Sequence, residues 1–236
     1  MFVGVQERLI RPQSLDVGVV QGLVTALCGR YPCLRPVAVG REMTALVLGQ
    51  DSPTRVLMTA TGVSALYLLR LCEEMAAHLR ADLPLCEVAL ARAFAGRQVW
   101  FVPTILNFTA GWEELQAFTQ KNGENPTNSQ AAGAEITAFA ALCHHTPFRH
   151  AVVLDGGADT VAWQGGEGTP SQSRLMARVL SAVSGYGIVP QHLPDGFAAW
   201  FIHRFHRPAL ALSLGQGTFE AVYAKAREML LLSLLF

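Results

Sequence analysis

RVLMTATGVSALYLLRLCEEMAAHLR, residues 55–80, is the stretch that decides the fold of this chain. It begins with a short β-type run, Val56–Thr59, and continues through a turn of small residues at 60–63. The remainder is apolar at three- and four-residue steps, which predicts a helix that Ser64 caps and that is buried on most sides. A strand that leads into a buried helix is the repeating unit of an α/β sheet, and such folds bind ligands at the turn between the two. That turn contains no charged residue, no histidine and no cysteine.

The rest of the chain alternates between expected strands and expected helices. Helices are expected at 15–30 (capped by Ser14), 85–94, 111–120, 134–145, 171–184, 197–206 and 219–232. Further strands are expected at 37–39, 45–48, 99–102, 151–154, 160–163 and 209–214. Neither a repeat nor a linker interrupts this order. The sequence therefore predicts a single α/β domain over residues 1–236, with a mixed, mostly parallel sheet of six to eight strands and helices on both faces.

Composition limits the classes of function. Half of the 236 residues are apolar (51%), and the 18 basic and 18 acidic residues balance, so no electrostatic feature favours nucleic acid or a membrane surface. No apolar run reaches the length of about 18 residues that crosses a bilayer, and residues 1–11 lack the apolar core of a secretion signal. The five cysteines are scattered and odd in number, which favours a reducing compartment. We expect a cytoplasmic globular protein that binds neither nucleic acid nor membranes.

Several different short motifs occur along the chain in one characteristic order. They are Tyr31-Pro32, Leu46–Gly49, Val102-Pro103, Leu106–Phe108 with Ala110–Trp112, Arg149–Ala151 and Gly215–Gly217. Through their order and spacing, nearly the whole chain resembles the zinc carboxypeptidase family, and within it the bacterial γ-D-glutamyl-meso-diaminopimelate peptidases. The resemblance implies that strands 56–59, 151–154 and 209–214 lie near the centre of the sheet. It also implies a zinc-dependent hydrolase of cell-wall peptides.

The residues that carry the chemistry of that family are replaced here. The family holds zinc with a His-x-x-Glu pair after the central strand and a His after a later strand, and a Glu near the last strand activates water. The resemblance puts the uncharged turn 61–64 in place of the pair, Asp155 at the third ligand position and Ser213 at the position of the catalytic Glu. The insertion that carries the substrate-binding Arg is missing after residue 105. Because a catalytic zinc needs three protein ligands and an open position, we expect no zinc, no other cofactor and no catalytic residue.

Two hypotheses from different functional classes follow. The favoured one is a degenerate, catalytically inactive relative that keeps the fold and a shallow cleft for a peptide or protein partner. The alternative is an active metallocarboxypeptidase that hydrolyses γ-D-glutamyl-meso-diaminopimelate peptides through an unrecognised metal site. In either case we expect a pocket between the ends of the three central strands, lined by Thr61, Asp155, Gly157 and Ser213, with Asn107 at its rim. Asp155 should accept a hydrogen bond there, from Thr61, Ser213 or the backbone N–H groups of residues 156 and 157.

Three other motifs are weaker. His203-x-x-His206 has the spacing of a metal-ligand pair on one helix face, but the arginines beside it favour a solvated surface. The glycine-rich stretch 165–168 lacks the Lys-Ser/Thr of a phosphate-binding loop. A hydrolytic triad can be written from Ser213, His150 and Asp155. No nucleophile-elbow motif surrounds Ser213, which disfavours that triad.

Overall fold

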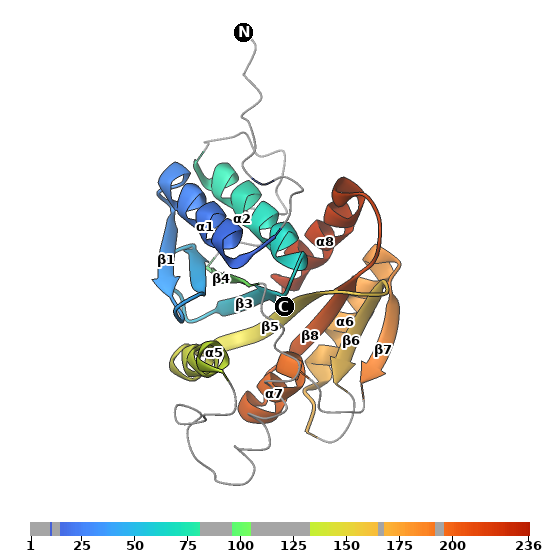
Figure 1. Cartoon of the computed structure of the whole chain (residues 1–236). Helices are drawn as coiled ribbons and strands as arrows, with labels where there is room; N and C mark the ends of the chain where they lie inside the picture. Colours follow the sequence, from blue (N-terminus) through green and yellow to red (C-terminus); the bar gives the residue numbers. More distant parts are fainter. Residues whose placement is uncertain (1–9, 11–14, 81–95, 105–132, 165–167, 192–195) are drawn as a thin grey trace.

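Eight strands form one sheet in the computed structural model, which describes residues 10, 15–80, 96–104, 133–164, 168–191 and 196–236 (Figure 1). The strands are β1 (Leu34–Ala38), β2 (Thr44–Leu48), β3 (Arg55–Ala60), β4 (Gln98–Pro103), β5 (Phe148–Gly156), β6 (Thr160–Gln164), β7 (Gly187–Gln191) and β8 (Ala209–Leu214). Their order across the sheet is β1-β2-β4-β3-β5-β8-β6-β7. The expected central position of β3, β5 and β8 is confirmed.

The sheet is mixed and mostly parallel, as the sequence predicted. Strands β4, β3, β5 and β8 run parallel to one another, and β6 and β7 form a second parallel pair. Antiparallel pairing joins β1 to β2, β2 to β4, and β6 to β8. The carboxyl ends of β3, β5 and β8 therefore meet at one edge of the sheet, and the amino end of β6 lies beside them.

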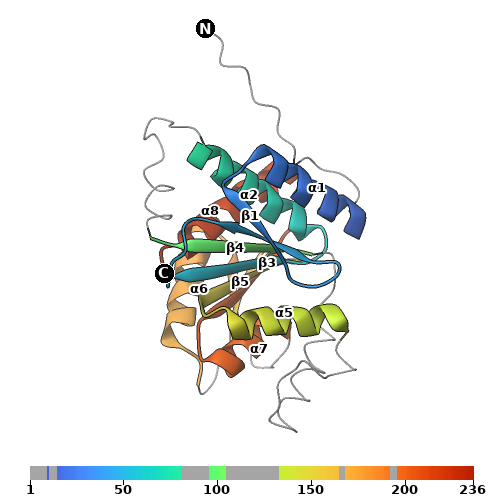
Figure 2. The same cartoon turned by 90° about the vertical axis from the view of Figure 1, so that its left-hand side faces the viewer.

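Helices cover both faces of the sheet (Figure 2). They are α1 (Val17–Arg30), α2 (Ser64–Arg80), α5 (Ala134–His145), α6 (Ser171–Ser184), α7 (Gly196–Phe205) and α8 (Phe219–Ser233). Helices α1, α2, α6 and α8 share one apolar core with the sheet, and α5 and α7 share the other. None of the described helices is both long and apolar enough to cross a bilayer.

Strand alternation explains the two cores. Successive side chains of a strand point to opposite faces, so β3 sends Val56 and Met58 to the α2 core and Leu57 to the α5 core. Along β5, Val152 and Leu154 likewise belong to the α2 core, whereas Ala151 and Val153 belong to the α5 core. A strand buried on both faces is apolar at most positions, which is why residues 56–58 and 151–154 are continuous apolar runs in the sequence.

Apart from shifts of a few residues at the ends of elements, the observed elements differ from the expected ones in the caps of two helices and in one missed strand. The cap of α1 is Asp16, whose carboxylate accepts the Val19 N–H at 2.8 Å, so the prediction of Ser14 was wrong. Helix α2 begins at Ser64 itself. Strand β7 was missed because it is an edge strand with exposed apolar side chains and a proline, which obscure the alternation on which strand prediction depends. The helices expected at 85–94 and 111–120 lie outside the described residues.

Candidate functional site

The carboxyl ends of β3, β5 and β8 bring together residues far apart in the sequence. Asp155 and Ser213 are direct partners in the β5–β8 register, and Thr61 follows the last residue of β3. The Thr61 N–H donates to the Leu154 carbonyl at 3.0 Å, which fixes Thr61 beside β5. Gly157 donates its N–H to the Leu214 carbonyl at 3.0 Å. We call the row Thr61, Asp155, Gly157 and Ser213 the carboxyl edge.

Asp155 is the carboxylate in this row, and two donors hold it. The Thr61 hydroxyl donates to Asp155 Oδ1 at 3.3 Å, and the Gly156 N–H donates to the same oxygen at 2.7 Å. Thr61 and Gly156 were two of the donors expected from the sequence. The side chain of Asp155 is exposed to solvent, so its second oxygen can be hydrated at little cost.

Gly157 and the side chain of Ser213 lie close together at this edge. A Cβ atom on Gly157 would stand 3.2 Å from Ser213 Oγ and 3.1 Å from Ser213 Cβ, tighter than ordinary van der Waals contact. The structure thus brings together four of the five residues expected in the pocket. Asn107, the fifth, lies outside the described residues, and the pocket itself stays a prediction.

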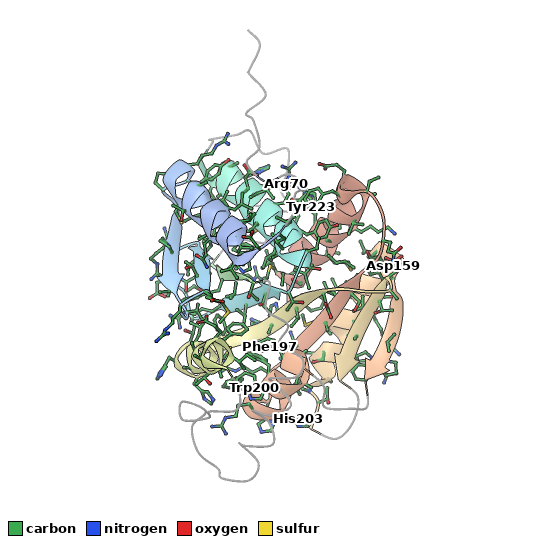
Figure 3. The ribbon with its side chains drawn as sticks, in the orientation of Figure 1. Arg70, Asp159, Phe197, Trp200, His203 and Tyr223 are labelled. Carbon is green, nitrogen blue, oxygen red and sulfur yellow. The ribbon has the colours of Figure 1, made fainter. Side chains whose placement is uncertain are left out.

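A second carboxylate, Asp159, lies close to this edge and was missed in the sequence (Figure 3). Its neighbour Thr160 pairs with Ser213 in the antiparallel β6–β8 ladder. A Cβ on Gly215 would collide with the Asp159 carboxylate, so the two segments approach as closely as glycine permits. Burial, reinforced by Asp159, raises the pKa of Tyr186 to about 12. No local motif marks Asp159, because only the β6–β8 pairing brings it here.

Comparison with known proteins agrees with this topology. No protein-family model and no curated protein sequence matches the chain. Solved structures do match. One is a metallo-carboxypeptidase from Burkholderia cenocepacia, with a TM-score of 0.66, 14% identity, and coverage of 91% of this chain and 67% of that one. A metallo-carboxypeptidase from Pseudomonas aeruginosa gives a TM-score of 0.60 at 12% identity, with coverage of 91% and 66%. The structure of bovine thrombin-activatable fibrinolysis inhibitor in complex with tick carboxypeptidase inhibitor gives a TM-score of 0.63 at 10% identity. This match covers 94% of this chain and 95% of that one.

This chain has the metallo-carboxypeptidase fold. The resemblance inferred from the motifs is thereby confirmed at the level of the fold. The chain spans about two thirds of the length of the two bacterial enzymes. At these identities the likeness concerns the backbone arrangement, so the chemistry has to be judged from the residues of this chain.

The residues at the carboxyl edge do not fit the zinc that this fold implies. They supply the Asp155 carboxylate and the hydroxyls of Thr61 and Ser213, and the nearby Asp159 brings the carboxylates to two. Structural and catalytic zinc sites use three or more His, Cys, Asp or Glu ligands. Over the described ranges, no cluster of three such side chains has the geometry to hold a metal ion. We therefore derive no catalytic step through zinc at this edge.

The hydrolytic triad of Ser213, His150 and Asp155 that can be written from the sequence does not exist in the structure. His150 lies near the amino end of β5 and Asp155 near its carboxyl end, five residues along one strand. At about 3.3 Å per residue, their Cα atoms are about 17 Å apart. They also differ by an odd number of residues, so their side chains point to opposite faces of the sheet.

The pair His203 and His206 does not form a helix face. Helix α7 ends at Phe205, and His206 has a φ of 52°, in the left-handed region. The His206 N–H donates to the Ile202 carbonyl at 2.8 Å, which closes the last turn. Both histidines and Arg204 are exposed, as expected for a solvated surface.

Apolar side chains border the carboxyl edge on the side of α2 and α8. Both helices begin just after a central strand, so their first turns lie at this edge. Tyr67 of α2 and Phe219 of α8 stack with ring centroids 4.8 Å apart, and both are partly buried. Val63, in the turn after Thr61, is 62% exposed. Tyr67 and Phe219 pack against the α2 core, so Val63 is the residue that adds accessible apolar surface beside the polar groups of the edge.

Proposed function

We propose that this protein is a catalytically inactive member of the metallo-carboxypeptidase fold that binds a peptide at its carboxyl edge. One observation carries the proposal. Asp155 and Ser213 are register partners at the strand ends where the resemblance expects a histidine ligand and the catalytic glutamate. A serine hydroxyl does not ionise near neutral pH without a partner, and one aspartate does not hold zinc. The carboxyl edge thus keeps a ligand-binding position without the groups for hydrolysis.

The chemistry of the edge indicates the kind of peptide. The exposed Asp155 carboxylate is a strong acceptor for an ammonium group, and the exposed side chain of Val63, two residues after Thr61, offers apolar contact. A peptide with a free amino group close to an apolar portion suits this arrangement. Given the resemblance, a cell-wall peptide that contains meso-diaminopimelate is our first candidate, and a protein segment with the same chemistry is the second. We place the protein in the cytoplasm, a proposal supported by the free thiols of Cys28, Cys33, Cys72 and Cys143.

Metal content and peptide binding test this proposal together. Elemental analysis of the purified protein, after incubation with zinc and desalting, should give far less than one zinc per chain. Calorimetric titration with γ-D-glutamyl-meso-diaminopimelate should show binding that Asp155→Asn weakens roughly tenfold, because a charge-assisted hydrogen bond is lost. Glu228→Gln, which alters an exposed carboxylate elsewhere on α8, is the matched control and should bind like the wild type. Equal binding by the Asp155→Asn variant and the wild type would show that Asp155 does not contribute to the binding site.

The alternative is an active metallocarboxypeptidase that hydrolyses γ-D-glutamyl-meso-diaminopimelate peptides. The fold shared with metallo-carboxypeptidases supports it. This alternative requires zinc near one per chain and release of diaminopimelate from a wall tripeptide. Finding both would overturn the inactive assignment.

A further inference from the structure

A polar cavity of about 450 Å3 lies at the edge of the sheet opposite the carboxyl edge. Its lining includes Arg35, Asp51, Arg55, Gln98, Trp100 and His145, and we call it the arginine pocket. Its volume falls within the range of small-molecule sites, about 300–1,000 Å3. We propose that the arginine pocket binds a small organic anion through a carboxylate or phosphate group.

The arginine pocket is separate from the carboxyl edge. Arg55 is the first residue of β3, and Thr61 follows its last residue. Six residues of extended strand, at about 3.3 Å each, place their Cα atoms about 20 Å apart. A ligand in the arginine pocket would therefore not occupy the peptide site proposed above.

Sheet register brings the two arginines to one face. Arg35 pairs with Val47, and Val47 pairs with Trp100, so all three project to the face that α5 covers. Arg55 pairs with Gln98, two residues before Trp100, and therefore projects to the same face. Helix α5 ends there with His145, which lines the cavity.

Arg55 is held in position before any ligand arrives. Its Nε donates to Gln98 Oε1 at 3.3 Å, and its Nη2 donates to Asp51 Oδ1 at 2.8 Å. Gln98 is buried, and the same oxygen also accepts from Trp100 Nε1 at 2.9 Å. A guanidinium has five N–H groups, so three remain without a hydrogen-bond partner in the described part of the chain. Fixing the arginine in advance lowers the entropic cost of binding an anion.

The charge of the pocket favours an anion. Arg35 and Arg55 contribute two positive charges, and Asp51 contributes one negative charge. The hydrogen bond from Arg55, and then its charge, lower the pKa of Asp51, so this carboxyl stays ionised and orients Arg55. Arg35 forms no ion pair with any described residue and can neutralise a ligand directly. A carboxylate or phosphate would complete the charge balance, whereas a cation would meet the net positive charge.

Calorimetric titrations with inorganic phosphate and with succinate test the proposal at low ionic strength, with chloride held constant. Binding of either anion is the expected result, and the stronger of the two identifies the acidic group. Arg35→Gln removes an exposed side chain without hydrogen bonds to the described core, and it should weaken binding roughly tenfold. Arg55→Gln should weaken binding at least as much.

Two controls keep the test decisive. Arg178→Gln alters an exposed arginine on α6 and should leave binding unchanged. Because Arg55→Gln also breaks bonds to the buried Gln98, a urea unfolding curve must accompany it, and Arg35→Gln alone suffices if that variant unfolds. Absence of binding by the wild type at millimolar anion would overturn the proposal. An equal loss with Arg178→Gln would also overturn it, because the effect would then be non-specific screening.

Discussion

His150 should make this protein sensitive to mild acid. It is fully buried on β5, and neither ring nitrogen has a hydrogen-bond partner within the described residues. Burial, and then the charge of Arg149, lower the pKa of His150 from 6.5 to about 4. The folded state therefore keeps the imidazole neutral, whereas the unfolded chain binds a proton below pH 6.5.

The sign and the size of the effect follow from proton linkage. A lowered folded-state pKa contributes stability that is fully present above pH 6.5 and is lost as the pH falls towards 4. The gap between these two pKa values corresponds to about 3 kcal/mol. Between pH 7.5 and 5.0 the loss should be about 2 kcal/mol, a large fraction of the stability of a typical domain.

Urea unfolding at pH 7.5, 6.5, 5.5 and 5.0 measures this loss. His150→Leu fills the same apolar site without a titrating group, so its unfolding free energy should change by about 2 kcal/mol less than that of the wild type over this range. His203→Gln removes an exposed histidine and should follow the wild type. If His150→Leu and the wild type lose stability in parallel, the buried imidazole is not the source of the acid sensitivity.

Three further substitutions test the packing, each by the urea midpoint at pH 7.5. Glu74→Gln weakens the acceptor that holds the Tyr223 hydroxyl (2.6 Å) and the Arg227 guanidinium (2.7 Å), and it should cost about 2 kcal/mol; an unchanged midpoint would show that α2 and α8 do not depend on this network. Gly49→Ala forces a side chain onto a φ of 96° and against the backbone carbonyl of Arg97, so a loss of about 1–3 kcal/mol is expected, and a stabilised variant would contradict this close approach. Asp16→Ala removes the cap of α1 and should cost about 1 kcal/mol, and no loss would place the start of α1 elsewhere.

The sequence by itself determined most of the described strands and helices, with β7 the strand that it missed. Periodicity and turn residues act over a few neighbouring positions, so they can be read without the fold. The helix at 134–145 and the strand at 209–214 have the predicted bounds. The motif order also led to the correct fold, although no residue at the family's zinc positions remained to support it.

Residues 70–73 show what local sequence patterns cannot explain. In the sequence, Glu73 falls on the apolar side of the helix expected after residue 63, which local reasoning alone does not explain. In the structure, Arg70 and Glu73 are both buried, and Arg70 also lies over the Tyr223 ring at 5.8 Å (Figure 3). Arg70 donates to the Ile10 carbonyl at 2.8 Å, and Glu73 accepts the Ile10 N–H at 3.2 Å. Both side chains thus bond to backbone about 60 positions away in the sequence, and they also form an ion pair with each other at 3.8 Å.

Only the tertiary structure decided which residues share a site. Asp155 and Ser213 meet because β5 and β8 pair in one register, and a shift of a single residue would turn one of them to the other face. Arg35 and Arg55 gather for the same reason, across four strands. Strand register is set by the packing of both cores at once. The energy of this packing depends on residues from many segments, so no short segment specifies it alone. Local sequence thus fixes the elements, and long-range pairing fixes the chemistry at the two edges of the sheet.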